Sequence, residues 1–133
     1  MISHTHIGVT DFDRAYRFYA ALLPSLGLQL KFNDTSKPWA GWMLPDQPRP
    51  LFLVGAPFDG EHAVGNGQMT ALLAPSRAAV DLAHQLALSY GGTDEGAPGL
   101  RPHYHANFYG AYFRDPEGNK LCVVCHHEEP APF

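Results

Sequence analysis

The spacing of apolar and polar residues divides the first half of the chain into a strand, a helix and three further strands. In the first strand, residues 4–9, Ile7 and Val9 share one face because alternate residues of a strand point to the same side. A helix over 11–23 follows a Thr-x-x-Asp start at Thr10 that can cap it. Its apolar residues recur at helical spacing and are Phe12, Tyr16, Tyr19 and Leu23. The remaining strands are expected at 28–32, 39–44 and 51–54.

The second half repeats this order of elements. A strand over 68–74 is followed by Ser76, which caps a helix over 77–90. Residues 93–102 are rich in Gly and Pro and are expected to form a loop. The last elements are paired strands at 109–114 and 120–126, joined by a turn over 115–119.

The repeat is one of pattern and not of sequence identity, and it predicts an α+β fold. Two β-α-β-β-β modules are expected to form one cupped, mixed, eight-stranded sheet with both helices on its convex side. We expect a single domain because 133 residues can bury one core. The expected ranges are module one at 1–57, a linker at 58–66, module two at 67–127 and a tail at 128–133.

Composition excludes several classes of partner. The chain is 45% apolar and 17% charged, which is typical of a folded globular protein. Its net charge of -4 and its lack of a basic cluster argue against nucleic acid and against an anionic membrane surface. No apolar run approaches the roughly 20 residues of a membrane span. The first residues carry no export signal, and two cysteines make no disulfide framework, so we expect a cytoplasmic protein with reduced thiols.

Alternation along the strands predicts which side chains face the cup. Since Ile7 and Val9 pack on the helix, His4 and His6 must face the other way. The same argument places Met69 and Cys122 in the cup. No Asp or Glu falls at a predicted cup position, which disfavours ions that prefer oxygen ligands. Zinc bound by His4, His6 and Cys122 is the alternative, since zinc accepts nitrogen and sulfur ligands.

Residues 100–109 form a second cluster of candidate functional side chains. Arg101 is suited to a carboxylate or a phosphate, and Tyr104 lies beside it in the sequence. His105 or Tyr109 can donate or accept a proton if it points inward. The alternative is a solvated segment whose aromatic residues cover the edge of the core. Trp42 likewise either lines the mouth of the cup or packs in the core.

Three segments of the chain resemble the vicinal oxygen chelate superfamily, which includes glyoxalase I, bleomycin-resistance proteins and extradiol dioxygenases. They are His4-Thr5-His6-Ile7-Gly8-Val9, then Asp11-Phe12-Asp13-Arg14-Ala15 with Phe18-Tyr19, and finally Arg114-Asp115-Pro116-Glu117-Gly118-Asn119-Lys120. The resemblance implies metal ligands on the first strand of each module, His or Gln, and a Glu on the last strand. His4 matches the first of these positions, whereas Met69 and Cys122 stand where His and Glu are usual.

The resemblance and the residues together predict a protein that binds a small organic molecule in the cup, with most of the usual metal ligands replaced. Two alternatives stay open: a metal-dependent lyase or dioxygenase with a non-standard His/Cys ligand set, and a non-catalytic protein that sequesters its ligand. No cofactor is expected if the protein binds a small molecule with its metal ligands replaced. A divalent metal ion is expected only in the metal-dependent alternative. The resemblance also implies a homodimer.

The candidate site residues fall into three groups. Any catalysis is expected to be proton abstraction beside a carbonyl, with one of three histidines as the base. The candidate bases are His4, His6 and His105. The candidate ligand-binding residues are Trp42, Met69, Arg101, Tyr104, Tyr109 and Cys122. The candidate metal ligand is His4.

Overall fold

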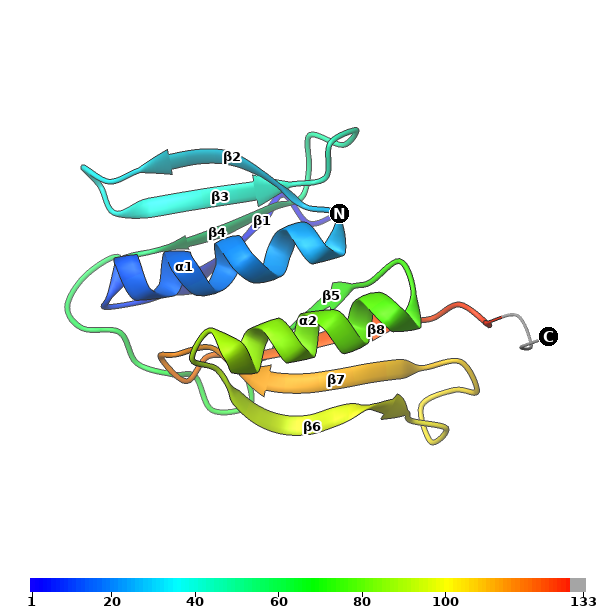
Figure 1. Ribbon diagram of the computed structural model, residues 1–133. Helices are drawn as coiled ribbons and strands as arrows, with labels where there is room; N and C mark the ends of the chain where they lie inside the picture. The colour runs from blue at the N-terminus through cyan, green and yellow to red at the C-terminus, as the bar shows by residue number, and fades with distance from the viewer. Residues whose placement is uncertain (130–133) are drawn as a thin grey trace.

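The computed structural model describes residues 1–129, and it consists of two modules that each contain one helix and four strands (Figure 1). The expected tail at 128–133 lies mostly outside the described residues. Module one contains β1 (His4–Gly8), α1 (Phe12–Leu22), the 3₁₀ turn η1 (Leu23–Leu26), β2 (Gln29–Asp34), β3 (Trp39–Met43) and β4 (Leu51–Gly55). Module two contains β5 (Thr70–Leu73), α2 (Arg77–Ser89), β6 (Thr93–Leu100), β7 (Tyr109–Arg114) and β8 (Lys120–Cys125).

The eight strands form two four-stranded sheets with the same topology, ordered β1-β4-β3-β2 and β5-β8-β7-β6. In each sheet the first and last strands of the module are parallel neighbours, and the other pairs are antiparallel. Both helices lie side by side on the same side of the sheets (Figure 1). The predicted α+β fold with two β-α-β-β-β modules is confirmed. The strands of the two modules are not joined into one hydrogen-bonded sheet. Instead, β1 and β5 are each the edge strand of a separate sheet.

The loop predicted at 93–102 is wrong, because Thr93–Leu100 forms the strand β6. This strand pairs antiparallel with β7, from Thr93 beside Arg114 to Leu100 beside Tyr109. Two register shifts, near Gly96 and before Gly99, accommodate the glycines and the proline. The Gly- and Pro-rich composition therefore marks bulges in an edge strand and not a loop.

The cap of α1 is also shifted by one residue from the expected Thr10. Asp11 is the N-cap, and its carboxylate accepts a hydrogen bond from the Arg14 backbone N–H at 3.1 Å. The predicted cap of α2 is correct, since the Ser76 hydroxyl oxygen accepts from the Ala79 N–H at 3.0 Å. Each helix thus begins at a residue whose side chain satisfies one free backbone donor.

The core lies between the helices and the faces of the sheets that they cover. Phe18, Tyr19 and Leu22 of α1 are fully buried. Phe18 contacts Phe113 of module two, with ring centroids 6.2 Å apart. Because this contact joins the two modules, they share one apolar core, as expected for small units that cannot bury enough surface alone.

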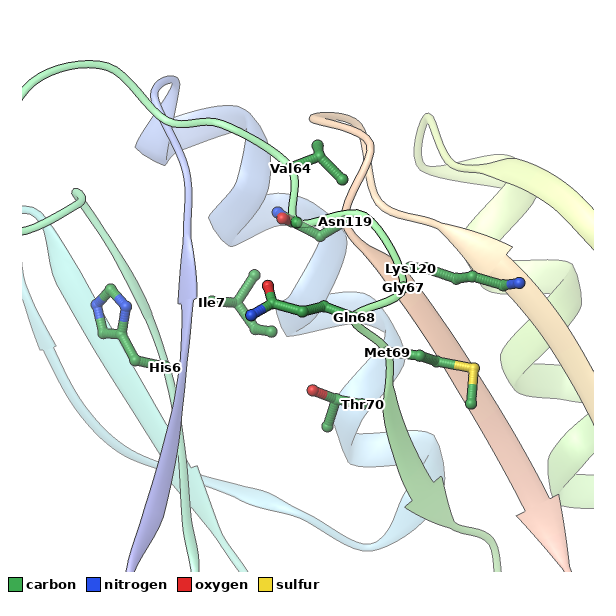
Figure 2. A pocket seen from close by; sticks show the side chains of 10 residues that line it. His6, Ile7, Val64, Gly67, Gln68, Met69, Thr70, Asn119 and Lys120 are labelled. Carbon is green, nitrogen blue, oxygen red and sulfur yellow. The ribbon is translucent and has the colours of Figure 1, made fainter.

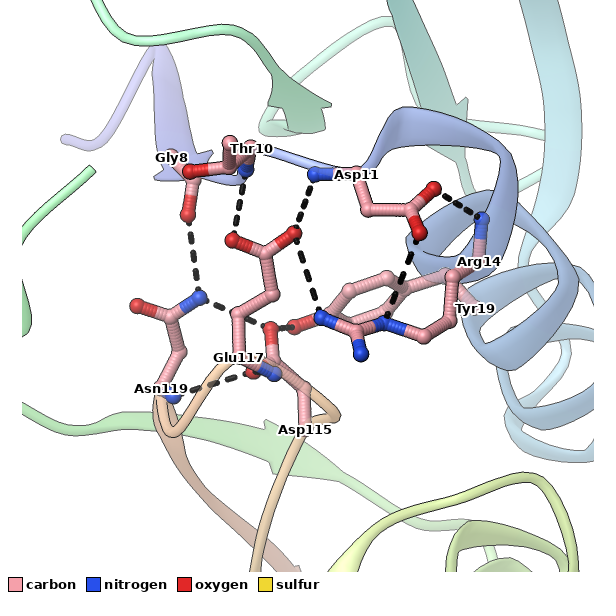
Figure 3. A network of polar contacts seen from close by, with 8 residues as sticks. All are labelled: Gly8, Thr10, Asp11, Arg14, Tyr19, Asp115, Glu117 and Asn119. Atoms are coloured by element: carbon pink, nitrogen blue, oxygen red, sulfur yellow. Dashed lines mark hydrogen bonds and ion pairs between the residues drawn. The ribbon is translucent and has the colours of Figure 1, made fainter. Parts of the chain in front are cut away.

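A polar network also joins the modules, where the turn between β7 and β8 meets the start of α1 (Figure 3). The buried Asp115 accepts a hydrogen bond from the Tyr19 hydroxyl at 2.7 Å. The Glu117 carboxylate accepts from the backbone N–H groups of Thr10 at 2.5 Å and Asp11 at 2.6 Å. Burial and the Asp115 carboxylate both hold the pKa of Tyr19 well above its usual value. The network fixes module two against module one by charge-assisted bonds.

Candidate functional site

Strand register places the two histidines of β1 on the sheet surface opposite the helices. Thr5 and Ile7 lie beside Phe52 and Val54, which are buried in the helix-packed core. His4 and His6 are beside Leu51 and Leu53 and therefore point to the other side. We call this surface the open face; in module two it carries Ala71, Leu73, Tyr112, Cys122 and Val124.

Cys122 of β8 also faces this open face, as the alternation predicts. Its neighbours in the sequence, Leu121 and Val123, pack in the core beneath the helices. Cys122 lies between Ala71 on one side and Tyr112 on the other. Only 1% of its surface is exposed, so the thiol is covered within module two. Met69, just before β5, remains 45% exposed.

The first hollow has a volume of about 400 Å³ and lies at the seam between β1 and β5 (Figure 2). Its wall is mostly polar, and its side chains include His6, Gln68, Met69, Thr70, Asn119 and Lys120. Figure 2 shows His6 and Met69 pointing away from each other, His6 toward the sheet of module one and Met69 toward that of module two. The seam thus offers hydrogen-bonding groups from both modules.

Electrostatics keep the His6 imidazole neutral at neutral pH. Partial burial, and to a lesser extent the nearby His4, lower the pKa of His6 below its usual 6.5. A neutral imidazole has one nitrogen free to accept a proton. His4 does not line this hollow, and its Nδ1 lies 3.0 Å from the Ser3 hydroxyl oxygen. His6 is therefore the better placed of the two as a proton acceptor at the seam.

The metal that the resemblance implies does not fit the donors of this chain. Among residues 1–129, no group of three or more His, Cys, Asp and Glu side chains is arranged to hold a metal ion. His4 lies beside Ser3, and the Cys122 thiol is buried in module two. The zinc set of His4, His6 and Cys122 is therefore not assembled within the described part of the chain.

The second hollow has a volume of about 390 Å³ and lies on the open face of module two. It is lined by Glu95, Gly96, Arg101, His103, Tyr104, Tyr112 and Lys120. The Arg101 guanidinium carbon is 5.6 Å from the Tyr112 ring centroid, and the Lys120 Nζ is 5.7 Å from it. Both cations therefore sit against one aromatic ring, within the range of cation–π attraction.

The Tyr112 hydroxyl and the Cys122 thiol beside this hollow keep their protons at neutral pH. Burial, with Cys122 and Tyr104 nearby, raises the pKa of Tyr112 to about 12. Burial also raises the pKa of the Cys122 thiol, although a hydrogen bond with Tyr112 and the charges of Arg101 and Lys120 act in the opposite direction. Because the thiolate is the reactive form, Cys122 is not an activated nucleophile here.

The loop after β6 folds into an aromatic cluster at the far end of module two. The Phe108 ring packs over Gly110, where an added Cβ would come within 2.8 Å of it. Tyr104 contacts Phe108, with ring centroids 4.8 Å apart. His105 Nε2 lies 2.8 Å from His126 Nδ1, so these imidazoles share a hydrogen bond. His105 lines neither of the two hollows described.

Two of the expected ligand-binding residues lie on the helix side of the sheets. Trp42 is 1% exposed and packs in the core, with its ring centroid 6.4 Å from that of Tyr19, so the core alternative describes it. The Tyr109 hydroxyl donates to Asp81 of α2 at 2.7 Å. This bond raises the pKa of Tyr109 to about 12. Alternation explains the placement of Tyr109, because it lies beside Cys125 and not beside Cys122.

Several lining residues were not singled out from the sequence. Gln68, Asn119 and Lys120 line the first hollow, and Tyr112 and Lys120 line the second. A signal was available for Lys120 and Tyr112. Lys120 lies two residues before Cys122 on the same strand face, and the cross-strand register brings Tyr112 beside that cysteine.

Comparisons with known proteins agree on the family. The family described as Glyoxalase/Bleomycin resistance protein/Dioxygenase superfamily matches residues 1–123. A crystal structure of a glyoxalase/bleomycin resistance protein from Albidiferax ferrireducens T118 is 34% identical, with a TM-score of 0.83 over 94% of this chain and 98% of that one. A search of curated proteins finds no match.

More distant solved structures share the fold. A glyoxalase-related enzyme from Fulvimarina pelagi is 15% identical, with a TM-score of 0.70 over 94% of this chain and 87% of that one. Lactoylglutathione lyase from Agrobacterium tumefaciens is 22% identical, with a TM-score of 0.63 over 94% and 92%. Within residues 1–129, none of the helices has the length and apolar character needed to cross a membrane. Because this family matches residues 1–123 and one of the solved structures with its name is 34% identical, the chain belongs to the Glyoxalase/Bleomycin resistance protein/Dioxygenase superfamily.

Proposed function

We propose that this protein binds a small, partly apolar organic molecule on the open face, with most of the family's usual metal ligands replaced. One observation carries the proposal: Lys120 lines both the hollow at the seam and the hollow of module two. Their volumes, about 400 and about 390 Å³, fall within the range of small-molecule sites. Polar groups at the seam and aromatic groups in module two together suit a molecule with one polar and one flat apolar end.

In this proposal His6 accepts a proton if the bound molecule reacts. The supporting observation is the lowered pKa of His6, which keeps the imidazole neutral at neutral pH. The chemistry would be abstraction of a proton beside a carbonyl, with the bound molecule's oxygen held by polar side chains of the seam. No step in this scheme requires a metal ligand set. A ligand-sequestering role needs the same binding and no such transfer.

We further propose that the protein works in the cytoplasm as a homodimer without nucleic acid partners. Its two cysteines, Cys122 and Cys125, are both free thiols, which suits a reducing compartment. Leu73 on the open face of β5 is 71% exposed, and Met69 nearby is 45% exposed, which gives an apolar strip for a second copy to cover. Light scattering on the purified protein measures the oligomeric state, and a monomer at micromolar concentration would reject the dimer.

Methionine methyl groups offer a direct test of binding. The chain has three methionines, of which Met69 lines the seam hollow, whereas Met1 is fully exposed and lines neither hollow. We would label these methyl groups with carbon-13 and record their NMR shifts against a library of small organic molecules. Binding on the open face should move the Met69 signal and leave the Met1 signal in place.

The same experiment separates the metal-dependent alternative. Ligand titrations would be run after chelator treatment and again with added zinc. The proposal expects equal affinities, because no donor set is assembled among the described residues. If no library member moves the Met69 signal, or if binding requires zinc, the proposed function is wrong.

A further inference from the structure

We propose that the hollow of module two recognises the carboxylate of a small, flat organic anion. We call it the Arg101–Lys120 pocket, lined by the seven residues Glu95, Gly96, Arg101, His103, Tyr104, Tyr112 and Lys120. This inference rests on the proposed function, because it specifies the chemical class of molecule bound on the open face. The charge of the pocket, the fixed position of Arg101 and the aromatic wall support it.

The pocket carries two positive charges that no carboxylate of residues 1–129 pairs with. Within the described residues, neither Arg101 nor Lys120 has a carboxylate within ion-pair distance. The one acidic side chain of the pocket, Glu95, is bound to Arg114, with Oε1 2.7 Å from Nε. Since the chain as a whole has a net charge of -4, this local excess of positive charge is specific to the pocket.

The backbone holds the Arg101 side chain in a fixed position. Its Nη1 donates to the Gly99 carbonyl and its Nη2 donates to the Ala97 carbonyl, both at 2.8 Å. Gly99 leaves room for this arrangement, because an added Cβ would lie only 3.2 Å from Nη1. A guanidinium has five N–H donors, so three remain for a ligand. A pre-positioned planar fork matches the two oxygens of a carboxylate.

Aromatic groups complete the pocket beside the charges. The Tyr112 ring lies against both Arg101 and Lys120. The Tyr104 ring contacts the His103 ring at a tilt, with ring centroids 4.3 Å apart. Flat aromatic walls favour a flat ligand, since offset stacking and apolar burial both gain from planar contact. The charges and the rings together point to an arenecarboxylate and not to an inorganic anion.

Isothermal titration calorimetry with salicylate and with its neutral amide, salicylamide, tests the charge requirement. Salicylate should bind at least about tenfold more tightly than salicylamide, because charge-assisted bonds are the stronger kind. Inorganic phosphate should bind more weakly than salicylate. Equal affinity for the acid and the amide, or tighter binding of phosphate, would overturn the proposal.

Substitutions then assign the charges to their residues. Arg101→Gln and Lys120→Gln should each weaken salicylate binding by about tenfold, while Lys120→Arg, which keeps the charge, should retain it. The matched control is Lys37→Gln, which removes an exposed positive charge from the turn between β2 and β3. Loss of binding in Lys37→Gln, or unchanged binding in both Gln variants of the pocket, would contradict the assignment.

Failure of this inference can be distinguished from failure of the proposed function. If neutral molecules move the Met69 methyl signal but salicylate and salicylamide bind equally, the open face binds ligands and the carboxylate preference is wrong. If nothing moves that signal and salicylate produces no heat, both proposals are wrong.

Discussion

The helix-covered faces of the two modules are alike, whereas their open faces differ. Beneath the helices, both sheets present buried apolar side chains in the same strand order. On the open face, module one carries the exposed imidazoles of His4 and His6, and module two carries Arg101, Tyr112 and Lys120. A strand can satisfy both demands because its alternate side chains point to opposite sides. Packing constrains one set of positions and leaves the other set free to acquire chemistry.

The largest expected effect on stability comes from removing a buried side chain from the core that the two modules share. Phe18→Ala should lower the free energy of unfolding by about 4 kcal/mol, because it removes a fully buried ring that contacts both modules. In the monomer, Leu73→Ala on the open face, where the side chain is 71% exposed, should cost less than about 0.5 kcal/mol. Urea denaturation measures both. Similar losses for the two variants would contradict the division between the faces.

The second-largest effect on stability is expected at the polar network that joins the two modules. Asp115→Ala leaves the Tyr19 hydroxyl and three N–H groups, two of Asn119 and one of Glu117, without their acceptor. Unpaired buried donors cost free energy, so we expect a loss of about 3 kcal/mol in unfolding free energy. Asp46→Ala, at an exposed turn, is the control. A loss below about 1 kcal/mol would show that the network is dispensable.

Thiol reactivity compares the open face with the helix-covered face within the single strand β8. Cys122 faces the open side and Cys125 the helices, and both are buried. Because both thiols are buried, and burial also raises the pKa of Cys122, both should react with a disulfide reagent at least about tenfold more slowly at neutral pH than in urea. Cys122→Ser and Cys125→Ser assign the two rates, and Cys122 should react first. Faster labelling of Cys125 than of Cys122 would mean that the helix-covered face is more accessible than the open face, which would contradict this prediction.

The smallest effect concerns the pH dependence of stability at His6. Because folding lowers its pKa, the unfolded chain binds this proton more readily. The corresponding stability is present above the usual pKa of 6.5 and is lost as pH falls through the lowered value. His6→Gln should remove this pH dependence of the unfolding free energy. We expect its total size to be below about 0.5 kcal/mol, since solvent screens the site. NMR titration checks the cause: the His6 imidazole should titrate below its usual 6.5.

The sequence was sufficient for the helix-covered layer, because that layer depends on local periodicity. The strands containing His4 and Cys122 and the helix containing Tyr19 follow directly from alternation and from helical spacing. The edge strand β6 was missed because its glycines and proline are poor strand residues. Its pairing with β7 overrides that preference. Whether β1 and β5 join by hydrogen bonds is likewise a tertiary property that no pattern within either strand encodes.

The candidate site was predictable only in part. Alternation correctly predicts His6 and Cys122 on the open face, and Lys120 lies on that same face, two residues before Cys122. Pairings between distant residues could not be foreseen. His105 bonds to His126, 21 residues further along the chain, because the loop after β6 folds back on the sheet. Trp42 was equally compatible with the cup and with the core, and only packing decided between them.

The bond between Tyr19 and Asp115 has a consequence for synthesis on the ribosome. The two residues are 96 positions apart, and the Tyr19 hydroxyl is buried. While the chain is being made, α1 emerges long before the acceptor for this phenol exists. Module one therefore cannot reach its final packing until the hairpin of β7 and β8 has left the exit tunnel, so the two modules complete their fold together and not one after the other.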